Sequence, residues 1–325
     1  MPEQITFGEL KEHQGLAVLP IQETPSSPQL DYLTLDVALA LGHVRITEVN
    51  DSGSVPELLL ENSAPKPVLL VDGEELVGAK QNRVLNLTIL APANQKIVIP
   101  VSCVEAGRWN HDSSDFANSN RAHFAKGRAK KMASVSESMH SHGERRSNQG
   151  EVWADIDTKF SRMDASSHTS AMSDLYEKAG SNLEDYVTAF ETTAKQIGAF
   201  FYVHGRLVGF DLFDKSVTCT RLFKKLLRSY AIDALEQPVT EQPPLDIDHA
   251  ESLLALLRAG EWQTYPAIGM GTDYRFSSPR AAAAGLVVDD TTIHLSGFIL
   301  NCGTEATDPE GRMASARIRR RMRTH

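Results

Sequence analysis

Two short stretches of the chain concentrate residue types that could bind an anionic ligand and transfer a proton. GAKQNR (78–83) places four polar residues between apolar runs, and SCVEAGRW (102–109) follows a second apolar run. Guanidinium groups bind phosphate oxygens, a carboxylate can transfer protons or accept ribose hydroxyls, and an indole can stack on a base. The candidate ligand-binding residues are Glu74, Lys80, Gln81, Arg83, Arg108 and Trp109, and the candidate catalytic residues are Glu105 and Cys103.

The strands that carry these stretches must bring them together. If RVLNLTIL and KIVIPVSCV pair across the APANQ turn near Ala93, Arg83 lies opposite Cys103 and Gln81 lies opposite Glu105, within a register of about two residues. The upstream PVLLVDGEELVG carries Asp-Gly, a tight-turn signal, which predicts a second hairpin with Glu74 and Glu75 near its turn. We therefore expect a polar cluster where a buried sheet ends.

Structural roles explain the same residues equally simply. Arg83 and Glu105 can form a cross-strand ion pair, Trp109 can cap the core, and Cys103 can be a small buried hydrophobe. A catalytic thiol at Cys103 is the weaker alternative, because the sequence identifies no partner histidine. Spacing alone leaves the functional and structural interpretations open.

Composition limits the classes of partner. The net charge of −9 makes nucleic acid an improbable partner, although residues 121–131 and 317–325 are locally basic. The beginning of the chain lacks the apolar segment of a signal peptide, and no apolar run is long enough to cross a bilayer, so we expect a cytoplasmic protein without a membrane partner. Three widely spaced cysteines predict thiols rather than disulfides or structural zinc.

No metal or cofactor is indicated by the sequence. His140 and His142 form an H-x-H pair in a polar segment, but no third ligand accompanies them. The turn around Gly269 and Gly271 lacks the strand-to-helix context of a phosphate loop. His294 alternates with apolar neighbours, which favours a hydrogen-bonded histidine inside a sheet. The sequence therefore leaves the cofactor unknown.

The distribution of strand and helix patterns predicts an α+β fold in three parts. Residues 1–109 form an antiparallel β-rich unit with one helix in DYLTLDVALALG and carry the two polar stretches. Residues 110–150 are poor in apolar residues and predict a long flexible loop or lid, with a short helix near Phe124 as an option. Residues 151–325 mix helices and β-hairpins, and we expect them to pack with the first part as one compact domain.

The third part shows clear helix and hairpin signals. EVWADIDTKFSRM has apolar residues at helical spacing, and a capping box at Ser181 and Glu184 predicts a helix that ends by Gly198. FFYVHGRLVGFDLF and AAGLVVDDTTIHLSGFIL predict hairpins that turn at 204–205 and 289–290. TRLFKKLLRSYAIDAL and HAESLLALLRAGEW predict two further helices, separated by a proline-rich linker at 236–246.

The motifs also resemble a known family. VDGEELVGAKQNR (71–83), SCVEAGRW, QGEVW (149–153) and IHLSGF (293–298) resemble the ARG (ADP-ribosylglycohydrolase) and rhodanese-phosphatase superfamily associated protein domain family, over about Val44 to Phe298. The family name records genomic association, which implies ADP-ribose, NAD-derived or related nucleotide chemistry. Its polar motif positions correspond here to Glu74, Gln81, Arg83, Cys103, Glu105, Arg108 and Trp109.

These observations give competing functional hypotheses. The first is an enzyme, or a protein built on an enzymatic pocket, that handles a small ADP-ribose-like or other phosphorylated nucleotide. In it Arg83 and Arg108 hold phosphate, Glu105 is the acid-base group and Trp109 stacks on the base. The alternative is a non-catalytic metabolite-sensing or protein-interaction module that uses the same residues. A purely structural role for the motifs is the third. The sequence does not indicate the substrate or the oligomeric state.

Overall fold

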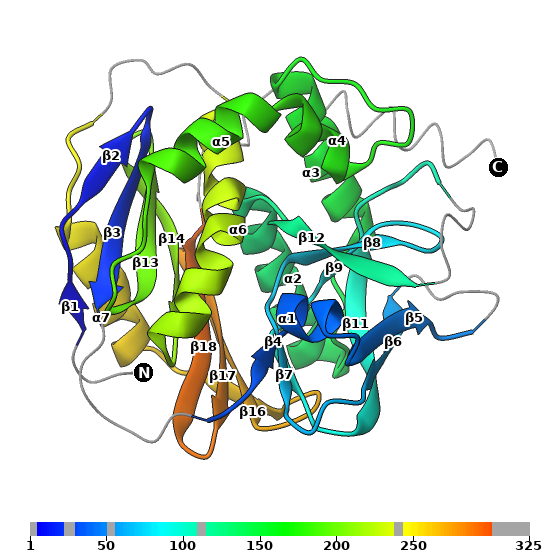
Figure 1. The fold of residues 1–325 in the computed structure, drawn as a ribbon. Helices are drawn as coiled ribbons and strands as arrows, with labels where there is room; N and C mark the ends of the chain where they lie inside the picture. Colours follow the sequence, from blue (N-terminus) through cyan, green and yellow to red (C-terminus); the bar gives the residue numbers. More distant parts are fainter. Residues whose placement is uncertain (1–4, 23–29, 51–55, 109–114, 237–242, 301–325) are drawn as a thin grey trace.

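Antiparallel sheets and helices pack together in the computed structural model, which describes residues 5–22, 30–50, 56–108, 115–236 and 243–300 (Figure 1). The fold is α+β, as the sequence predicts. The helices are α1 (Leu35–Ala40), α2 (Ala125–His142), α3 (Gln149–Arg162), α4 (Met172–Lys178), α5 (Gly180–Ala189), α6 (Ser216–Ala234) and α7 (Asp248–Ala259).

One large sheet of nine strands forms one side of the molecule (Figure 1). In spatial order its strands are β1 (Thr6–Phe7), β3 (Leu16–Gln22), β13 (Gln196–Val203), β14 (Arg206–Phe213), β18 (Thr291–Ile299), β17 (Ala281–Val288), β16 (Thr272–Ser277) and β15 (Gln263–Pro266), with β2 (Lys11–His13) paired on β3. The predicted hairpins β13–β14 and β17–β18 are both present. Their turns use left-handed residues, His204 at φ 49° and Asp290 at φ 61°.

Two smaller sheets form the other side and carry the polar motifs. The six-stranded sheet has the order β12 (Phe116–Ala122), β8 (Glu74–Gly78), β9 (Arg83–Leu85), β11 (Gln95–Cys103), β6 (Glu57–Asn62) and β5 (Val44–Glu48). The three-stranded sheet has the order β10 (Ile89–Ala91), β7 (Val68–Leu70) and β4 (Leu33–Thr34), and β4 runs parallel to β7. The predicted opposition of Arg83 and Cys103 is confirmed.

The hairpin predicted across Asp72 and Gly73 is wrong. A tight turn does form there, because Gly73 adopts φ 84° and the Glu74 amide donates to the Val71 carbonyl at 3.1 Å. The strands on either side then diverge, however: β7 pairs with β10 and β4, whereas β8 pairs with β9 and β12. The turn therefore transfers the chain from one sheet to the next.

The long flexible loop expected for residues 110–150 is also wrong where the structure describes it. That stretch contains β12 and the 18-residue α2, which ends at a left-handed Gly143 with φ 71°. The pattern misled because Arg128, Lys131 and Ser136 on α2 are buried. Since they pair with groups inside the molecule, their polarity does not indicate exposure.

The helix predicted from Ser181 to Gly198 is shorter than expected. It begins at Gly180, its N-cap residue Ala179 has no side-chain hydrogen bond, and it ends at Ala189. Gly198 lies in β13 instead. The predicted helices at α1, α3, α6 and α7 are confirmed. The three-part division of the chain stays a prediction, although β3 from the first part lies beside β13 in the large sheet.

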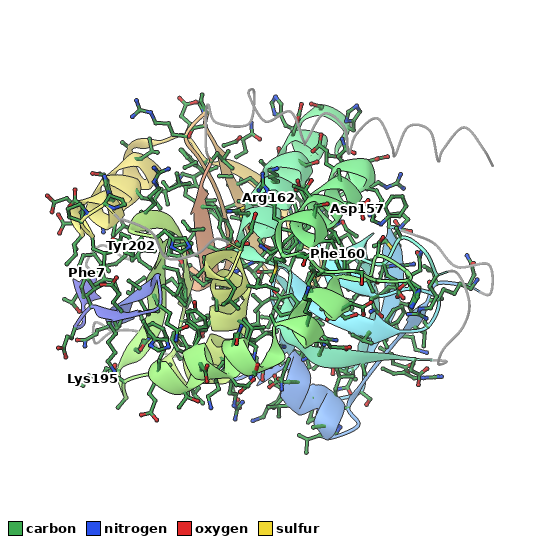
Figure 2. The ribbon with its side chains drawn as sticks, turned by 90° about the horizontal axis from the view of Figure 1, so that it is seen from above. Phe7, Asp157, Phe160, Arg162, Lys195 and Tyr202 are labelled. Atoms are coloured by element: carbon green, nitrogen blue, oxygen red, sulfur yellow. The ribbon has the colours of Figure 1, made fainter. Side chains whose placement is uncertain are left out.

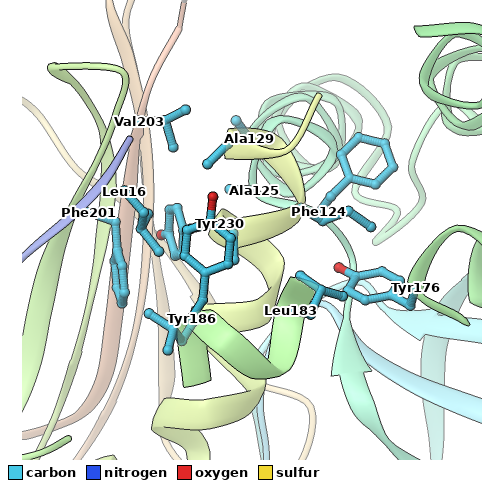
Figure 3. Close-up of a cluster of buried hydrophobic side chains, with 14 of the residues drawn as sticks. Leu16, Phe124, Ala125, Ala129, Tyr176, Leu183, Tyr186, Phe201, Val203 and Tyr230 are labelled. Atoms are coloured by element: carbon cyan, nitrogen blue, oxygen red, sulfur yellow. The ribbon is translucent and has the colours of Figure 1, made fainter. Parts of the chain in front are cut away.

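The main apolar core fills the space between the large sheet and helices α2 to α6 (Figure 3). Tyr230 of α6 stacks on Phe201 of β13 with ring centroids 3.9 Å apart and planes 8° apart. Viewed from above, Phe160 of α3 and Tyr202 of β13 lie toward opposite sides of the molecule (Figure 2). No helix in the described ranges is long and apolar enough to span a bilayer.

Candidate functional site

The pairing of β9 with β11 brings the two polar stretches into contact. Cys103 is the register partner of Arg83, and the Gln81 side-chain amide donates to the Glu105 carbonyl at 2.9 Å. Arg83 is fully buried and donates through Nη1 to Gln81 Oε1 at 3.1 Å. Asn82 and Lys80 are also buried. We call Gln81, Asn82, Arg83, Cys103, Glu105 and Arg108 the motif cluster.

The Glu105 carboxylate accepts hydrogen bonds from three neighbouring residues. Arg108 binds it through two nitrogens, at 2.9 Å and 2.7 Å. The Asn82 amide at 3.0 Å and Thr169 Oγ1 at 3.1 Å complete the set. Burial alone would raise the pKa of Glu105, but these donors together hold it below the usual value. Glu105 is therefore a carboxylate at neutral pH.

The ion pair suggested between Arg83 and Glu105 is replaced by a different arrangement. Glu105 pairs with Arg108, three residues later in the chain. Arg108 also donates to the Ala79 carbonyl at 2.7 Å and to Asn82 Oδ1 at 3.2 Å, so it ties both motifs together. In this conformation Arg108 positions Glu105 rather than presenting all its donors to a ligand.

Cys103 is a buried thiol at the end of β11. Burial raises its pKa, and the nearby Arg83 guanidinium only partly offsets that effect. Its Sγ lies 3.1 Å from Gln81 Oε1 and 3.1 Å from the Glu105 carbonyl oxygen, and its single proton can be donated to either one or shared between them. The neutral thiol thus serves as a hydrogen-bond donor, and its catalytic role stays a prediction.

The structure separates Glu74 from the motif cluster and brings Glu75 closer instead. Glu74 accepts from Lys225 of α6 at 2.5 Å and from the Val71 amide at 2.7 Å. Glu75, the next residue on β8, points to the other face, as strand alternation requires. There it accepts from Arg121 at 2.6 Å and from Ser119 at 2.9 Å.

Glu75 and Glu105 differ in their proton affinity. Burial raises the pKa of Glu75, against the opposing effect of Arg121 and Ser119, and the charge of Glu105 raises it further. Glu105 is shifted in the opposite direction. Glu75 was absent from the predicted site residues, although its place directly before the VGAKQNR stretch was the available signal.

Gln149 is a second residue that the predicted site omitted. This first residue of α3 donates to the Cys103 carbonyl at 2.7 Å and accepts from the Cys103 amide at 2.8 Å. Trp153, one turn later, lies near enough to lower the pKa of Cys103, although its buried Nε1 has no hydrogen-bond partner among the described residues. The QGEVW motif therefore joins the motif cluster in space. Trp109 lies outside the described residues.

Two partly exposed arginines bind Glu105 of the motif cluster and the nearby Glu75. The side chains of Arg108 and Arg121 are 18% and 21% exposed, whereas the carboxylates that they bind are almost fully buried. Their guanidinium groups form the accessible edge of the site. No cluster of three or more His, Cys, Asp or Glu side chains within the described ranges is placed to hold a metal ion. His140 bonds instead with Gln263, at 3.0 Å.

A separate buried polar network links the two sides of the molecule. His294 lies between Thr88, at 2.7 Å, and Asp211, at 3.2 Å, which confirms the prediction of a hydrogen-bonded sheet histidine. Asp211 also binds both terminal nitrogens of Arg128, at 2.7 Å and 3.0 Å. The IHLSGF motif therefore has a structural position away from the motif cluster.

Comparison with known proteins gives one result about identity. The curated proteins and the solved structures compared with this chain gave no match. The family model of the ARG and Rhodanese-Phosphatase-superfamily-associated Protein domain matches residues 4–298. This range includes both motif stretches, Gln149 and His294, so the match covers every part of the site described above. The chain belongs to the ARG and Rhodanese-Phosphatase-superfamily-associated Protein domain family.

Proposed function

We propose that this protein is an enzyme that binds an ADP-ribose-like or other phosphorylated nucleotide at the accessible edge of the motif cluster. The family name associates the domain with ARG and rhodanese-phosphatase proteins, which supports ligands of this class. The observation that carries the proposal is the pairing of two glutamates, whose pKa values shift in opposite directions, with two partly exposed arginines.

Each residue has a role that follows from its environment. Arg121 uses Nε for Glu75 and has Nη1 3.7 Å from the exposed Glu177, and its solvent-facing side can bind a phosphate oxygen in place of that weak pair. Glu105 remains ionised and can accept a proton or a ribose hydroxyl hydrogen bond. Glu75 retains its proton to a higher pH, so the pKa values of the two carboxyl groups are further apart. Arg108 holds Glu105 in place through two hydrogen bonds and lies between Glu105 and solvent.

A non-catalytic metabolite sensor is the second candidate, and one observation favours it. Glu105 already accepts four hydrogen bonds, from Arg108 twice, Asn82 and Thr169. Proton transfer from a substrate to Glu105 would require at least one of these hydrogen bonds to break, whereas ligand binding at Arg121 would not. Turnover that depends on Glu105 supports the enzyme, and binding without turnover supports the sensor.

Calorimetric titration with ADP-ribose, NAD and AMP tests the site. We expect ADP-ribose binding to weaken about tenfold or more in Arg121→Ala, because a charge-assisted hydrogen bond to phosphate is lost. Arg206→Ala is the matched control, since Arg206 is an exposed arginine at the start of β14 in the large sheet. Absence of binding to all three ligands, or equal weakening in both variants, would reject the proposal.

A further inference from the structure

A polar cavity lies apart from the motif cluster, between α2, the start of α3, the edge strand β15 and its neighbour β16. Its volume is about 550 Å³, which is ample for a small metabolite. None of the motif-cluster residues lines it. The lining residues are Lys130, Ala133, Ser134, Ser136, Glu137, His140, Asn148, Glu151, Glu261, Gln263, Arg275, Ser277 and Leu300.

Arg275 supplies a buried cation to the cavity wall. It is only 3% exposed, and Asp273 binds its Nε at 2.8 Å and its Nη2 at 2.9 Å. This two-point contact fixes the plane of the guanidinium. Its third nitrogen, Nη1, forms no hydrogen bond within the described part of the chain. A fixed guanidinium with a remaining donor is well suited to bind one carboxylate.

The rest of the wall carries an excess of negative charge. Lys130 is paired with Asp155 at 2.9 Å, and Arg275 is paired with Asp273, so both cations are locally balanced. Glu137, Glu151 and Glu261 are exposed carboxylates that also line the cavity. They surround the space with three negative charges, which repel phosphates and attract ammonium groups.

We propose that this cavity binds a basic amino acid, such as lysine or arginine, with its carboxylate on Arg275 and its cationic groups toward the glutamates. The neutral Asp273–Arg275 pair offers one site for an anion, and the three glutamates offer places for both the α-ammonium and the side-chain cation. A diamine lacks the carboxylate that would bind Arg275. A simple carboxylic acid lacks the ammonium groups that would bind the glutamates.

Titration of the full chain with L-lysine, putrescine and hexanoate, followed by ligand-observed NMR and calorimetry, tests this assignment. We expect L-lysine to bind most tightly of the three. Glu137→Gln combined with Glu261→Gln should weaken lysine binding about tenfold or more, because two ammonium partners become neutral. Glu177→Gln is the matched control, since Glu177 of α4 is 69% exposed and does not line the cavity.

Arg275→Gln tests the contact with the ligand carboxylate separately from the contacts with its ammonium groups. It should weaken lysine binding without weakening putrescine binding, because Asp273 is left without its cation and adds negative charge beside the cavity. The double glutamate variant keeps the test decisive if Arg275→Gln does not fold, because both glutamates are exposed. Three results would overturn the proposal: no lysine binding, putrescine binding as tightly as lysine, or unchanged lysine binding in the double variant. These outcomes are independent of nucleotide binding at the motif cluster.

Discussion

Buried charged side chains in this protein depend on specific partners. Lys159 of α3 lies between Asp233, at 2.5 Å, and Glu236, at 2.9 Å. Arg162 reaches the other oxygen of Glu236, also at 2.9 Å. Burial alone would raise the pKa of Glu236, but Lys159, Lys126 and Arg162 lower it to about 2. Such a shift makes stability depend on pH.

Glu236→Gln should reveal this dependence. The folded pKa lies below the unfolded value of 4.5, so the carboxylate stabilises the fold above pH 4.5 and loses that effect as the pH falls toward 2. The full shift corresponds to roughly 3 kcal/mol. We expect the variant to be less stable than wild type at pH 7 by about 1–3 kcal/mol, with the gap closing as the solution is acidified.

Urea unfolding of both proteins between pH 7 and pH 3 measures that gap. Glu184→Gln is the control, because Glu184 is 61% exposed in its pair with Arg228 and should change stability little at any pH. A gap that stays constant over the whole range would show that the loss in Glu236→Gln is not electrostatic.

At the scale of elements, close backbone contact explains why Gly198 lies inside β13, whereas the sequence predicted it at the end of a helix. A Cβ added at Gly198 of β13 would lie 2.3 Å from the Asp211 carbonyl oxygen and 2.9 Å from Leu212 Cα of β14. Both obstacles are backbone atoms of the paired strand, so they cannot move without disturbing the sheet. Gly198 is therefore required by strand packing rather than by the end of a helix.

Gly198→Ala should destabilise the protein by about 1–3 kcal/mol, the usual cost of overpacking. Gly180→Ala is the matched control. Gly180 begins α5 and has nothing within 4 Å of an added Cβ, so alanine there should be neutral or slightly stabilising. Guanidinium unfolding curves measure both. Equal effects of the two substitutions would contradict the strand-packing explanation.

Local patterns predicted the elements that local interactions determine. The β13–β14 and β17–β18 hairpins and the α6 and α7 helices follow from turn residues and apolar spacing. Helix α2 did not, because its buried Arg128 and Lys131 are neutralised by Asp211 and Asp72, which are distant in sequence. Long-range ion pairs leave no local periodicity, so composition alone indicated a loop.

The candidate site was predictable to a similar extent. The predicted pairing of Arg83 with Cys103 is confirmed, but the hairpin from which it was derived is not formed: Ile89–Ala91 pairs with β7, and the first part of β11 pairs with β6. The choice between Glu74 and Glu75 depended on which face of β8 meets α6, and the contact of Gln149 with Cys103 depends on the packing of α3. Those are tertiary facts that strand alternation alone does not specify.

At the scale of the whole molecule, Arg128 connects its two sides. This α2 residue binds Asp211 of the large sheet, and its Nε lies 3.6 Å from Asp72 at the start of the motif region. Its side chain is fully buried and its guanidinium lies 5.0 Å from the centre of the Phe298 ring. Removing either charge of the Arg128–Asp211 pair leaves the other buried without its two-point partner.

A double-mutant cycle on this pair should show strong coupling. We expect Arg128→Met and Asp211→Asn each to cost about 3–5 kcal/mol, and the double variant to cost clearly less than their sum. The exposed Arg45–Asp115 pair is the control, with an expected coupling below about 1 kcal/mol. Chemical unfolding supplies all the free energies. Additive costs for Arg128 and Asp211 would show that the pair does not join the two sides.

The contact between Gln149 and Cys103 has a mechanical consequence. The side-chain amide of Gln149 hydrogen-bonds both the N–H and the C=O of Cys103, so it takes the place of a neighbouring strand at the end of β11. The same helical turn carries Asn148 and Glu151, which line the polar cavity. A displacement of that turn would therefore change both the cavity wall and the hydrogen bonds to Cys103. The beginning of α3 thus couples the polar cavity to the motif cluster.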